Sequence, residues 1–178
     1  MTRKQAFFGY GFMVKRFIFA FVLLFALSSC FYSVYSNAYP HLKKIRVLAL
    51  ENRSSEFALG DKLLTLLNQK IRNDGRLKLV TRDPDCTLEG SVTSFKESVY
   101  SYDAANQVQD YQLQMNVSVT FTDLVKNAVL YENKNLSLTE LYAVSAGGTA
   151  KFKTKEEAID ELIAKLYQTV LQNSLESW

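Results

Sequence analysis

The stretch Tyr111-Gln-Leu-Gln-Met-Asn-Val-Ser-Val-Thr-Phe-Thr122 decides the fold, because apolar and uncharged polar side chains alternate along its whole length. Side chains of a β-strand point in turn to the two faces of a sheet, so this period of two predicts a strand with one buried and one polar face. The apolar face must be covered by another part of the chain. The segments with a helical period are the candidates to cover it.

Two segments repeat apolar side chains every three or four residues, which is the period of an amphipathic helix. The first, about 56–73, has Ser54 or Ser55 available as an N-cap and stops before Gly75, a residue suited to a helix C-terminus. The second begins with the capping box Thr154-Lys-Glu-Glu157 and runs to the end of the sequence. Each helix has a single apolar stripe to bury.

The other β-rich segments are 45–50, 77–81, 86–101 and 129–141, and Gly90 in the third of them suggests a bulge. The first segment connects onward through a helix and can pair parallel to a later strand, whereas the others form hairpins. Both helices fit on the same side of one sheet. We therefore expect an α+β fold, a two-layer sandwich in which a mostly antiparallel sheet of four to five strands carries two helices packed on one face.

The N-terminal segment has the order of a secretion signal. Basic residues at positions 3, 4, 15 and 16 precede the apolar run 17–27, and Ser28-Ser29-Cys30 follows. The apolar run is shorter than the roughly 20 residues that a helix needs to cross a bilayer. We expect residues 1–29 to be a signal peptide, with Met13 as an alternative start to Met1.

The ending Leu27-Ser28-Ser29-Cys30 resembles the lipobox of bacterial lipoproteins. The resemblance implies diacylglycerol on the Cys30 thiol, cleavage before Cys30 and acylation of the new amino group, for example by palmitate. Two or three acyl chains together hold a protein durably on a membrane. The alternative is a chance cysteine after an ordinary signal peptide. After Cys30 we expect a lipidated tether over 30–43 and a single α+β domain over 44–178.

Composition excludes one class of partner. Four of the 21 Lys and Arg residues lie in 1–29 and none of the 18 Asp and Glu residues does, so the charge beyond residue 29 is about −1. That balance does not suit a nucleic-acid binder. Beyond Cys30 the chain has one cysteine, Cys86, which we interpret as a small buried residue in preference to a reactive thiol.

The sequence offers no convincing catalytic constellation. The one histidine, His41, lies in the expected tether beside a proline, and we interpret it as solvated. Asp83 and Asp85 flank a proline and indicate a turn more than a cation site. The pair Gly147-Gly148 lacks the Lys-Ser/Thr ending of a phosphate-binding loop and indicates a flexible hairpin tip. We expect no enzymatic activity, no cofactor and no metal.

Two surfaces are candidates for binding. The polar side of the strand, from Gln112 to Thr122, is uncharged and suits either a partner, a polar ligand or plain hydration. The lysines Lys151, Lys153 and Lys155 form a small basic group, which either meets lipid phosphates or keeps a loop soluble. The sequence does not choose among the readings of the polar strand face, whereas for the three lysines we favour solubility of the loop.

The chain resembles the lipopolysaccharide-assembly lipoprotein family LptE. The resemblance rests on the segments 45–54, 76–92 and 111–123 and on the helix that starts near Glu157-Ala158. It implies an outer-membrane lipoprotein, on the periplasmic side, whose domain lies in the lumen of the LptD β-barrel and supports barrel assembly and lipopolysaccharide delivery to the cell surface. Lys151, Lys153 and Lys155 then become candidate lipopolysaccharide contacts. Phe31, in a position where inner-membrane lipoproteins often carry Asp, agrees with this location.

A different class remains open. A periplasmic lipoprotein adaptor, acting as an auxiliary subunit of a lipid-trafficking transporter or of a cell-wall synthase, has a related order of strands and helices. The two readings differ in the partner, which is a large outer-membrane barrel in one and an inner-membrane assembly in the other.

Overall fold

The computed structural model describes residues 39–176, which lie within the unit Asn37–Trp178. The expected signal peptide 1–29 and the expected lipidation site Cys30 lie outside the described residues. The elements in chain order are β1 (Lys44–Val47), β2 (Glu51–Asn52), α2 (Leu59–Asp74), β3 (Lys78–Leu79), β4 (Cys86–Tyr102), β5 (Val108–Asp123), β6 (Ala128–Ala143) and α3 (Lys155–Leu175).

All six strands belong to one sheet with the order β3-β1-β4-β5-β6, and β2 pairs separately with β4. The long strands β4, β5 and β6 are antiparallel neighbours, whereas β1 is parallel to β3 and β4 because α2 intervenes in the chain. The predicted α+β sandwich with a mostly antiparallel sheet is confirmed. The sheet has six strands instead of four to five, because the short strand β2, just after the expected strand 45–50, also pairs with β4.

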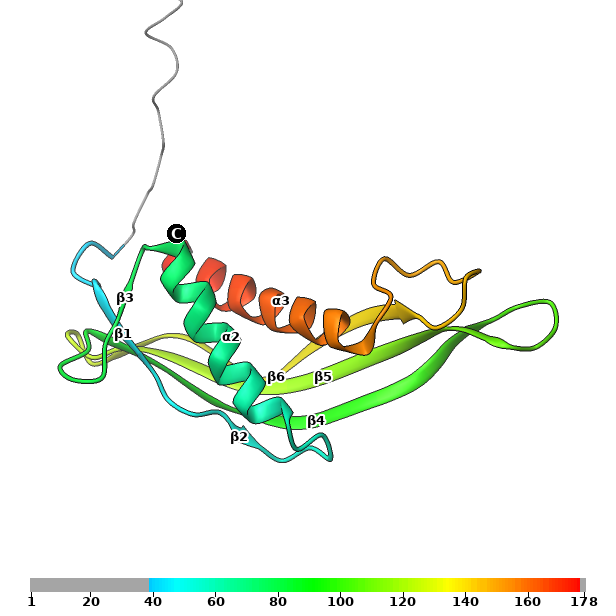
Figure 1. Cartoon of the computed structure of the whole chain (residues 1–178). Coiled ribbons are helices and arrows are strands. Elements are labelled where there is room, and N and C mark those ends of the chain that lie inside the picture. The colour runs from blue at the N-terminus through cyan, green and yellow to red at the C-terminus, as the bar shows by residue number, and fades with distance from the viewer. Residues whose placement is uncertain (1–38, 177–178) are drawn as a thin grey trace, which may run out of the picture. The chain divides into compact units, whose positions relative to one another are not determined.

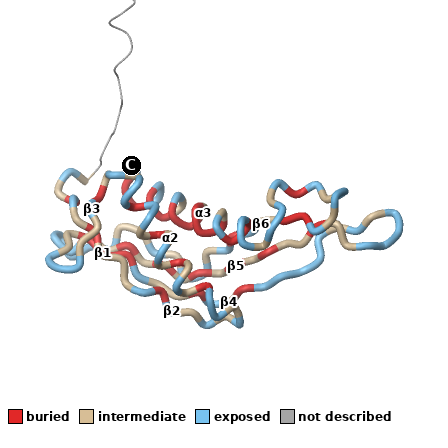
Figure 2. The backbone as a smooth tube through the Cα atoms, in the orientation of Figure 1, coloured by how far each residue is buried: buried red, intermediate tan, exposed pale blue. Residues whose placement is uncertain are grey.

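Both helices pack on one side of the sheet (Figure 1) and their buried residues face it (Figure 2). In β5 every second side chain from Leu113 to Phe121 is buried, as the alternation predicted. In α3 the buried stripe supplies most of the opposing layer. Its residues are Ala158, Ile159, Leu162, Ile163, Ala164, Leu166, Tyr167, Val170, Leu171, Ser174 and Leu175.

Two of the three helix caps predicted from the sequence are confirmed. Gly75 adopts a left-handed conformation with φ of 74° and its N–H bonds to the Ile71 carbonyl, as a C-terminal glycine does. At α3, the Thr154 hydroxyl accepts from the Glu157 N–H. The expected cap of α2 at Ser54 or Ser55 is wrong. Helix α2 begins later, after Ala58, because Ser54 Oγ is used in a local turn with Asn52.

Gly90 is a site of close backbone approach and not a bulge. It pairs in register with Val119, and the nearest irregularity in β4 lies between Val92 and Ser94. A Cβ atom added at Gly90 would lie 2.1 Å from the Ser118 carbonyl oxygen. Only glycine lets the two backbones come this close.

The folded part begins earlier than the expected boundary at residue 44. Leu42 is fully buried in the core, and the Lys43 and Lys44 amides donate to the Asp85 carboxylate. The interpretation of His41 as solvated is wrong, because its Nε2 lies 2.6 Å from Oδ2 of Asp123. These contacts were invisible in the sequence because their partners are 41 to 82 positions away.

Candidate functional site

The face of the sheet away from the helices carries side chains that are mostly polar and uncharged. It starts with the even-numbered residues of β5 and extends to their paired neighbours on β4 and β6, because directly paired residues point to the same face. We call this surface the open polar face. Its uncharged polar residues include Ser91, Ser94, Ser98, Gln112, Gln114, Asn116, Ser118, Thr120, Ser137 and Thr139, and by the same pairing Glu89, Lys96, Glu132 and Leu141 also lie on it.

Cross-strand hydrogen bonds order the middle of the open polar face. Asn116 Nδ2 donates to Ser94 Oγ at 3.0 Å, and Gln114 Nε2 donates to Ser137 Oγ at 3.1 Å. Within the described part of the chain, Asn116 Oδ1 is buried and has no hydrogen-bond partner. A buried acceptor without a partner costs free energy, so this amide lowers the stability of the sheet locally.

Three charged residues also lie on the open polar face, all of them on the outer strands. Thr120 pairs with Glu89 on β4 and with Glu132 on β6. Gln114 pairs with Lys96 on β4. Charges of both signs therefore lie on the outer strands, while β5 in the centre carries none from Tyr111 to Thr122. Such a surface can form many hydrogen bonds without a strong field of either sign, which suits a hydrated and polar partner surface.

The buried carboxylate of Asp110 stabilises the end of the sheet at which β4 connects to β5. It accepts from Ser101 Oγ at 2.7 Å, from the Thr149 N–H and hydroxyl, and from the Ala150 N–H at 3.1 Å. Burial alone would raise the pKa of Asp110, but these donors lower its pKa to about 2. The loop with Gly147-Gly148 is therefore bound to β4 and β5, and Gly148 packs against Asp110 and Ala143. Gly147-Gly148 lies in the connection from β6 to α3, so the prediction of a hairpin tip there is wrong.

Lys155 belongs to a polar cluster on the helix side. Its Nζ lies 2.9 Å from Oε2 of Glu56 and 3.0 Å from Oε2 of Glu97. Tyr142 donates its hydroxyl to Glu97 and stacks on Tyr111 at 5.6 Å between ring centroids. Burial opposes ionisation of Glu97, but the Tyr142 and Lys155 contacts hold its pKa below the usual value. Two carboxylates thus already neutralise Lys155.

Lys151 and Lys153 lie on the loop before α3 and are exposed. Lys151 Nζ lies 4.7 Å from the centroid of the Phe152 ring, and Lys153 Nζ donates to the Ala150 carbonyl at 3.0 Å. Neither ammonium is paired with a carboxylate in the described residues. Of the three lysines predicted as lipopolysaccharide contacts, these two keep an uncompensated charge, and the contact itself stays a prediction.

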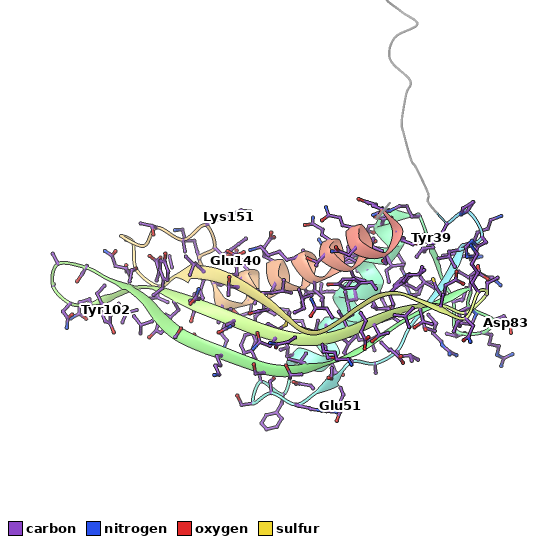
Figure 3. All side chains as sticks on the ribbon, turned by 180° about the vertical axis from the view of Figure 1, so that it is seen from behind. Tyr39, Glu51, Asp83, Tyr102, Glu140 and Lys151 are labelled. Atoms are coloured by element: carbon purple, nitrogen blue, oxygen red, sulfur yellow. The ribbon has the colours of Figure 1, made fainter. Side chains whose placement is uncertain are left out.

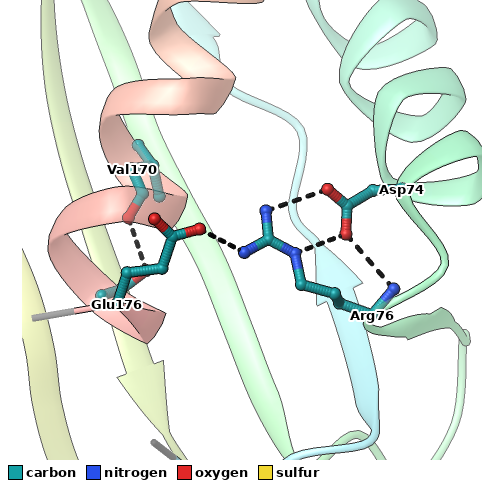
Figure 4. A network of polar contacts seen from close by, with 5 residues as sticks. Asp74, Arg76, Val170 and Glu176 are labelled. Atoms are coloured by element: carbon teal, nitrogen blue, oxygen red, sulfur yellow. Dashed lines mark hydrogen bonds and ion pairs between the residues drawn. The ribbon is translucent and has the colours of Figure 1, made fainter. Parts of the chain in front are cut away.

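A groove of about 370 Å³ lies between the C-terminal halves of α2 and α3. Arg76 lies beside it and joins the ends of the two helices, with bonds to both oxygens of Asp74 and to Glu176 (Figure 4). The hydrogen bond to Asp74 raises the pKa of Arg76. Burial opposes this shift, and the bond to Glu176 adds to it. Because these ion pairs join the end of α2 to the end of α3, the network holds the two helices together.

Other candidates from the sequence have structural roles. Asp85 accepts from the amides of Lys43 and Lys44, so the turn around Pro84 is hydrogen-bonded to the start of β1. Cys86 is fully buried, as predicted, and burial raises its pKa to about 12. Among residues 39–176 there is no group of three or more metal-ligating side chains. Within that same range, no helix has the length and apolar content that a membrane span requires.

The comparisons with known proteins agree with this geometry. The family model of LptE, described as lipopolysaccharide-assembly, matches residues 42–174. The chain belongs to the LptE family. The match begins at the buried Leu42 and ends within the last turn of α3, so the LptE resemblance covers the strands and both helices. Among curated proteins, none matches this LptE chain.

Solved structures resemble this LptE protein at low identity. Uncharacterized lipoprotein B from Nitrosomonas europaea has 18% identity and a TM-score of 0.51, covering 75% of this chain and 83% of its own. A PelC dodecamer from Paraburkholderia phytofirmans has 15% identity and a TM-score of 0.48, covering 75% and 89%. Rare lipoprotein B from Shewanella oneidensis has 17% identity and a TM-score of 0.36, covering 72% and 87%. The Nitrosomonas likeness shows a shared fold.

Sequence reasoning located the β5 part of the open polar face but missed its β4 part. The bulge between Val92 and Ser94 shifts the alternation, so that Ser91 and Ser94 share a face although they are three positions apart. A local excess of serine over 91–101 was the only available signal. The Asp110 cluster had no signal at all, because its partners are far apart in the chain.

Proposed function

We propose that this LptE-family protein is a non-enzymatic outer-membrane lipoprotein, anchored through Cys30, whose domain occupies the lumen of a large LptD-like β-barrel. In that position it supports assembly of the barrel and delivery of lipopolysaccharide to the cell surface. The observation that supports this most is the open polar face. An ordered surface of hydroxyls and amides, with a few charges of both signs on its outer strands, suits the wet, polar interior of a large barrel.

The open polar face suits a barrel interior in both its charge and its hydration. A barrel interior presents side chains of both signs and ordered water, so a plug with a strong field of one sign would be repelled at some positions. Hydroxyl and amide groups can donate or accept, so they pair with either kind of neighbour, directly or through water. The packed core behind β5 keeps this surface rigid, which lowers the entropy lost on docking.

The first test is the partner. The tagged full chain is expressed with its leader, extracted from outer membranes in detergent, and its co-purifying proteins are identified by mass spectrometry. The proposal expects a large β-barrel in near-equal amount and surface lipopolysaccharide that falls when the protein is depleted. An inner-membrane transporter or a cell-wall synthase in its place would support the adaptor reading and refute the plug.

A second test concerns the open polar face itself. Ser118→Lys places an unpaired charge at the centre of this face, and Thr65→Lys places the same charge on the exposed side of α2 as the matched control. We expect co-purification of the barrel to fall several-fold for Ser118→Lys and to change little for Thr65→Lys. Equal retention of the barrel by both variants would mean that the open polar face is not the principal contact.

A further inference from the structure

The outer side of β4 has no partner strand along its second half. On that side β1 and β2 pair with β4 only as far as Val92, and among residues 39–176 no further strand follows. In Figure 3, β4 runs from the level of Glu51 to Tyr102 as the outermost ribbon of the sheet. Its inner side pairs with β5 without a register shift over residues 94–99. We call this segment, 94–99, the free β4 edge.

The alternation of antiparallel pairing decides which backbone groups of the free β4 edge point outwards. The Val92 carbonyl accepts from the Arg53 N–H on the outer side, and Val92 pairs with an odd-numbered residue of β5. Phe95, Glu97 and Val99 also pair with odd-numbered residues of β5. Their N–H and C=O groups therefore point away from the sheet. An extended backbone is the binding partner that matches such a row of donors and acceptors.

The other long edge of the sheet, β6, is guarded against pairing. The Thr139 carbonyl accepts from Lys165 Nζ at 3.0 Å, and the Ala143 N–H donates to the Phe152 carbonyl at 2.8 Å. A register shift near the middle of β6 interrupts its regular course. Covered groups and irregularities of this kind are how proteins protect an edge strand. Within the part of the chain that the structure describes, the outward groups of the free β4 edge have no such cover.

The charges of the free β4 edge disfavour a second copy of this chain as the added strand. In an antiparallel pair of two such edges, the registers with the greatest overlap place Lys96 opposite Lys96 or Glu97 opposite Glu97, and like charges in direct opposition are destabilising. A register between these two would turn the side chains to the wrong faces. Lys96 is exposed and has no ion pair among the described residues, so a foreign segment with a carboxylate opposite it gains one.

The helix side of the free β4 edge offers apolar contacts. Val99 is 37% exposed. Lys155 Nζ lies 3.0 Å from Glu97 and 2.9 Å from Glu56, so the turn that carries Phe57 lies beside this edge. The Phe57 side chain is 91% exposed. An added strand with apolar residues on this side would remove both exposed side chains from water.

We propose that the free β4 edge binds an extended segment of the barrel partner as an added β-strand inside the lumen. The inference rests on the proposed function, which supplies that partner, and it adds a second contact beside the open polar face. The added segment carries a carboxylate opposite Lys96 and apolar side chains towards Val99 and Phe57. Backbone hydrogen bonds along the edge then fix the register of the two proteins, and the side chains select the segment.

The first test removes one outward donor. Proline is tolerated on an edge strand where its missing N–H would face away from the sheet, so Val99→Pro leaves the pairing with β5 intact. The matched control is Ala104→Pro, in the turn in which the Asn106 amide donates to the Asp103 carbonyl, because proline suits that position of a turn. Urea unfolding checks that both full-length variants are folded.

Each variant is extracted from outer membranes in detergent and its barrel partner is quantified. The proposal expects recovery of the barrel to fall by about fivefold or more for Val99→Pro, because a hydrogen bond is lost and the ring obstructs the added strand. Ala104→Pro should recover as much barrel as the native chain. Equal recovery by the two variants overturns the proposal.

Amide hydrogen exchange of the native chain needs no variant, so it decides the question even if Val99→Pro fails to fold. Peptides that span 94–99 are compared between the isolated chain and its barrel complex. The proposal expects the outward amides there to exchange rapidly in the isolated chain and at least about tenfold more slowly in the complex. Unchanged exchange overturns it, and so does equal slowing of the outward amides of β6, which would indicate general shielding by the lumen.

Failure of this inference and failure of the proposed function are separable. A barrel recovered in near-equal amount, with unchanged exchange at 94–99, overturns the added strand and leaves the proposed function intact. Absence of a barrel from the native preparation overturns the proposed function and this inference with it. A dimer of the isolated chain that is lost in Val99→Pro identifies a second copy as the occupant and overturns the inference alone.

Discussion

Replacement of Asp110 by Asn should destabilise the domain strongly, although the two side chains have the same shape. One oxygen of Asp110 accepts from the Ala150 amide, and the other accepts from Ser101 and from both donors of Thr149. After the Asp110→Asn substitution, either orientation of the side-chain amide directs its NH₂ group at a backbone N–H. With hydrogen bonds to charged groups contributing about 1.5–3 kcal/mol each and not adding fully, we expect a loss of about 3 kcal/mol.

Urea unfolding of the mature chain measures this loss. With an m-value of about 2 kcal/mol/M, the midpoint should fall by about 1.5 M. The matched control is Asp103→Asn, because a single oxygen of Asp103 accepts both of its amide bonds, from Ala105 and Gln107, and Asn retains such an oxygen. A midpoint shift for Asp110→Asn no larger than that of the control would refute the reasoning.

The pH dependence gives an independent check on the same carboxylate. The pKa of Asp110 is lowered from 3.8 to about 2, so its contribution is complete above the unfolded-state pKa and is lost as the pH falls through the folded-state value. The stability difference between the native chain and Asp110→Asn should therefore be constant near neutral pH and shrink between about pH 4 and pH 2. A difference that is the same at pH 7 and pH 2.5 would show that the carboxylate charge is not the cause.

Three further outcomes follow from the packing. Gly90→Ala should cost about 3 kcal/mol or more in urea unfolding, since its methyl group would overlap the backbone of β5, whereas Gly60→Ala, near the start of α2 with a nearest contact of 3.4 Å, should be neutral or stabilising. Cys86 should resist thiol reagents at pH 8 in the native state and react once the chain is unfolded, as mass spectrometry can show, because it is buried and its pKa is raised to about 12. Lys155→Met should lower stability by about 1 kcal/mol or less, because this ion-pair cluster is partly exposed, and Lys155→Arg should restore it; a larger loss would indicate that the carboxylates are more desolvated than their exposure suggests.

Local patterns in the sequence determined most of the architecture. The alternation from Tyr111 to Thr122 specified both the strand and its buried face, because the side-chain period of a strand needs no information from the rest of the fold. The capping box at Thr154 and the glycine at position 75 located helix ends for the same reason, since they satisfy backbone groups a few residues away. The LptE resemblance was likewise visible in these fold-defining segments.

Only the tertiary structure decided the contacts between distant segments. His41 was assigned to solvent because nothing near it in the chain suggests a partner, and the carboxylate it meets is 82 positions away. Lys155 looked like one of three equivalent cations until β4 and the segment before α2 brought Glu97 and Glu56 to it. The sheet register, shifted by a bulge after Val92, decided which serines join the polar strand. Such pairings depend on where the packed helices and strands place remote residues. The local periodicity of apolar side chains contains no information about that placement.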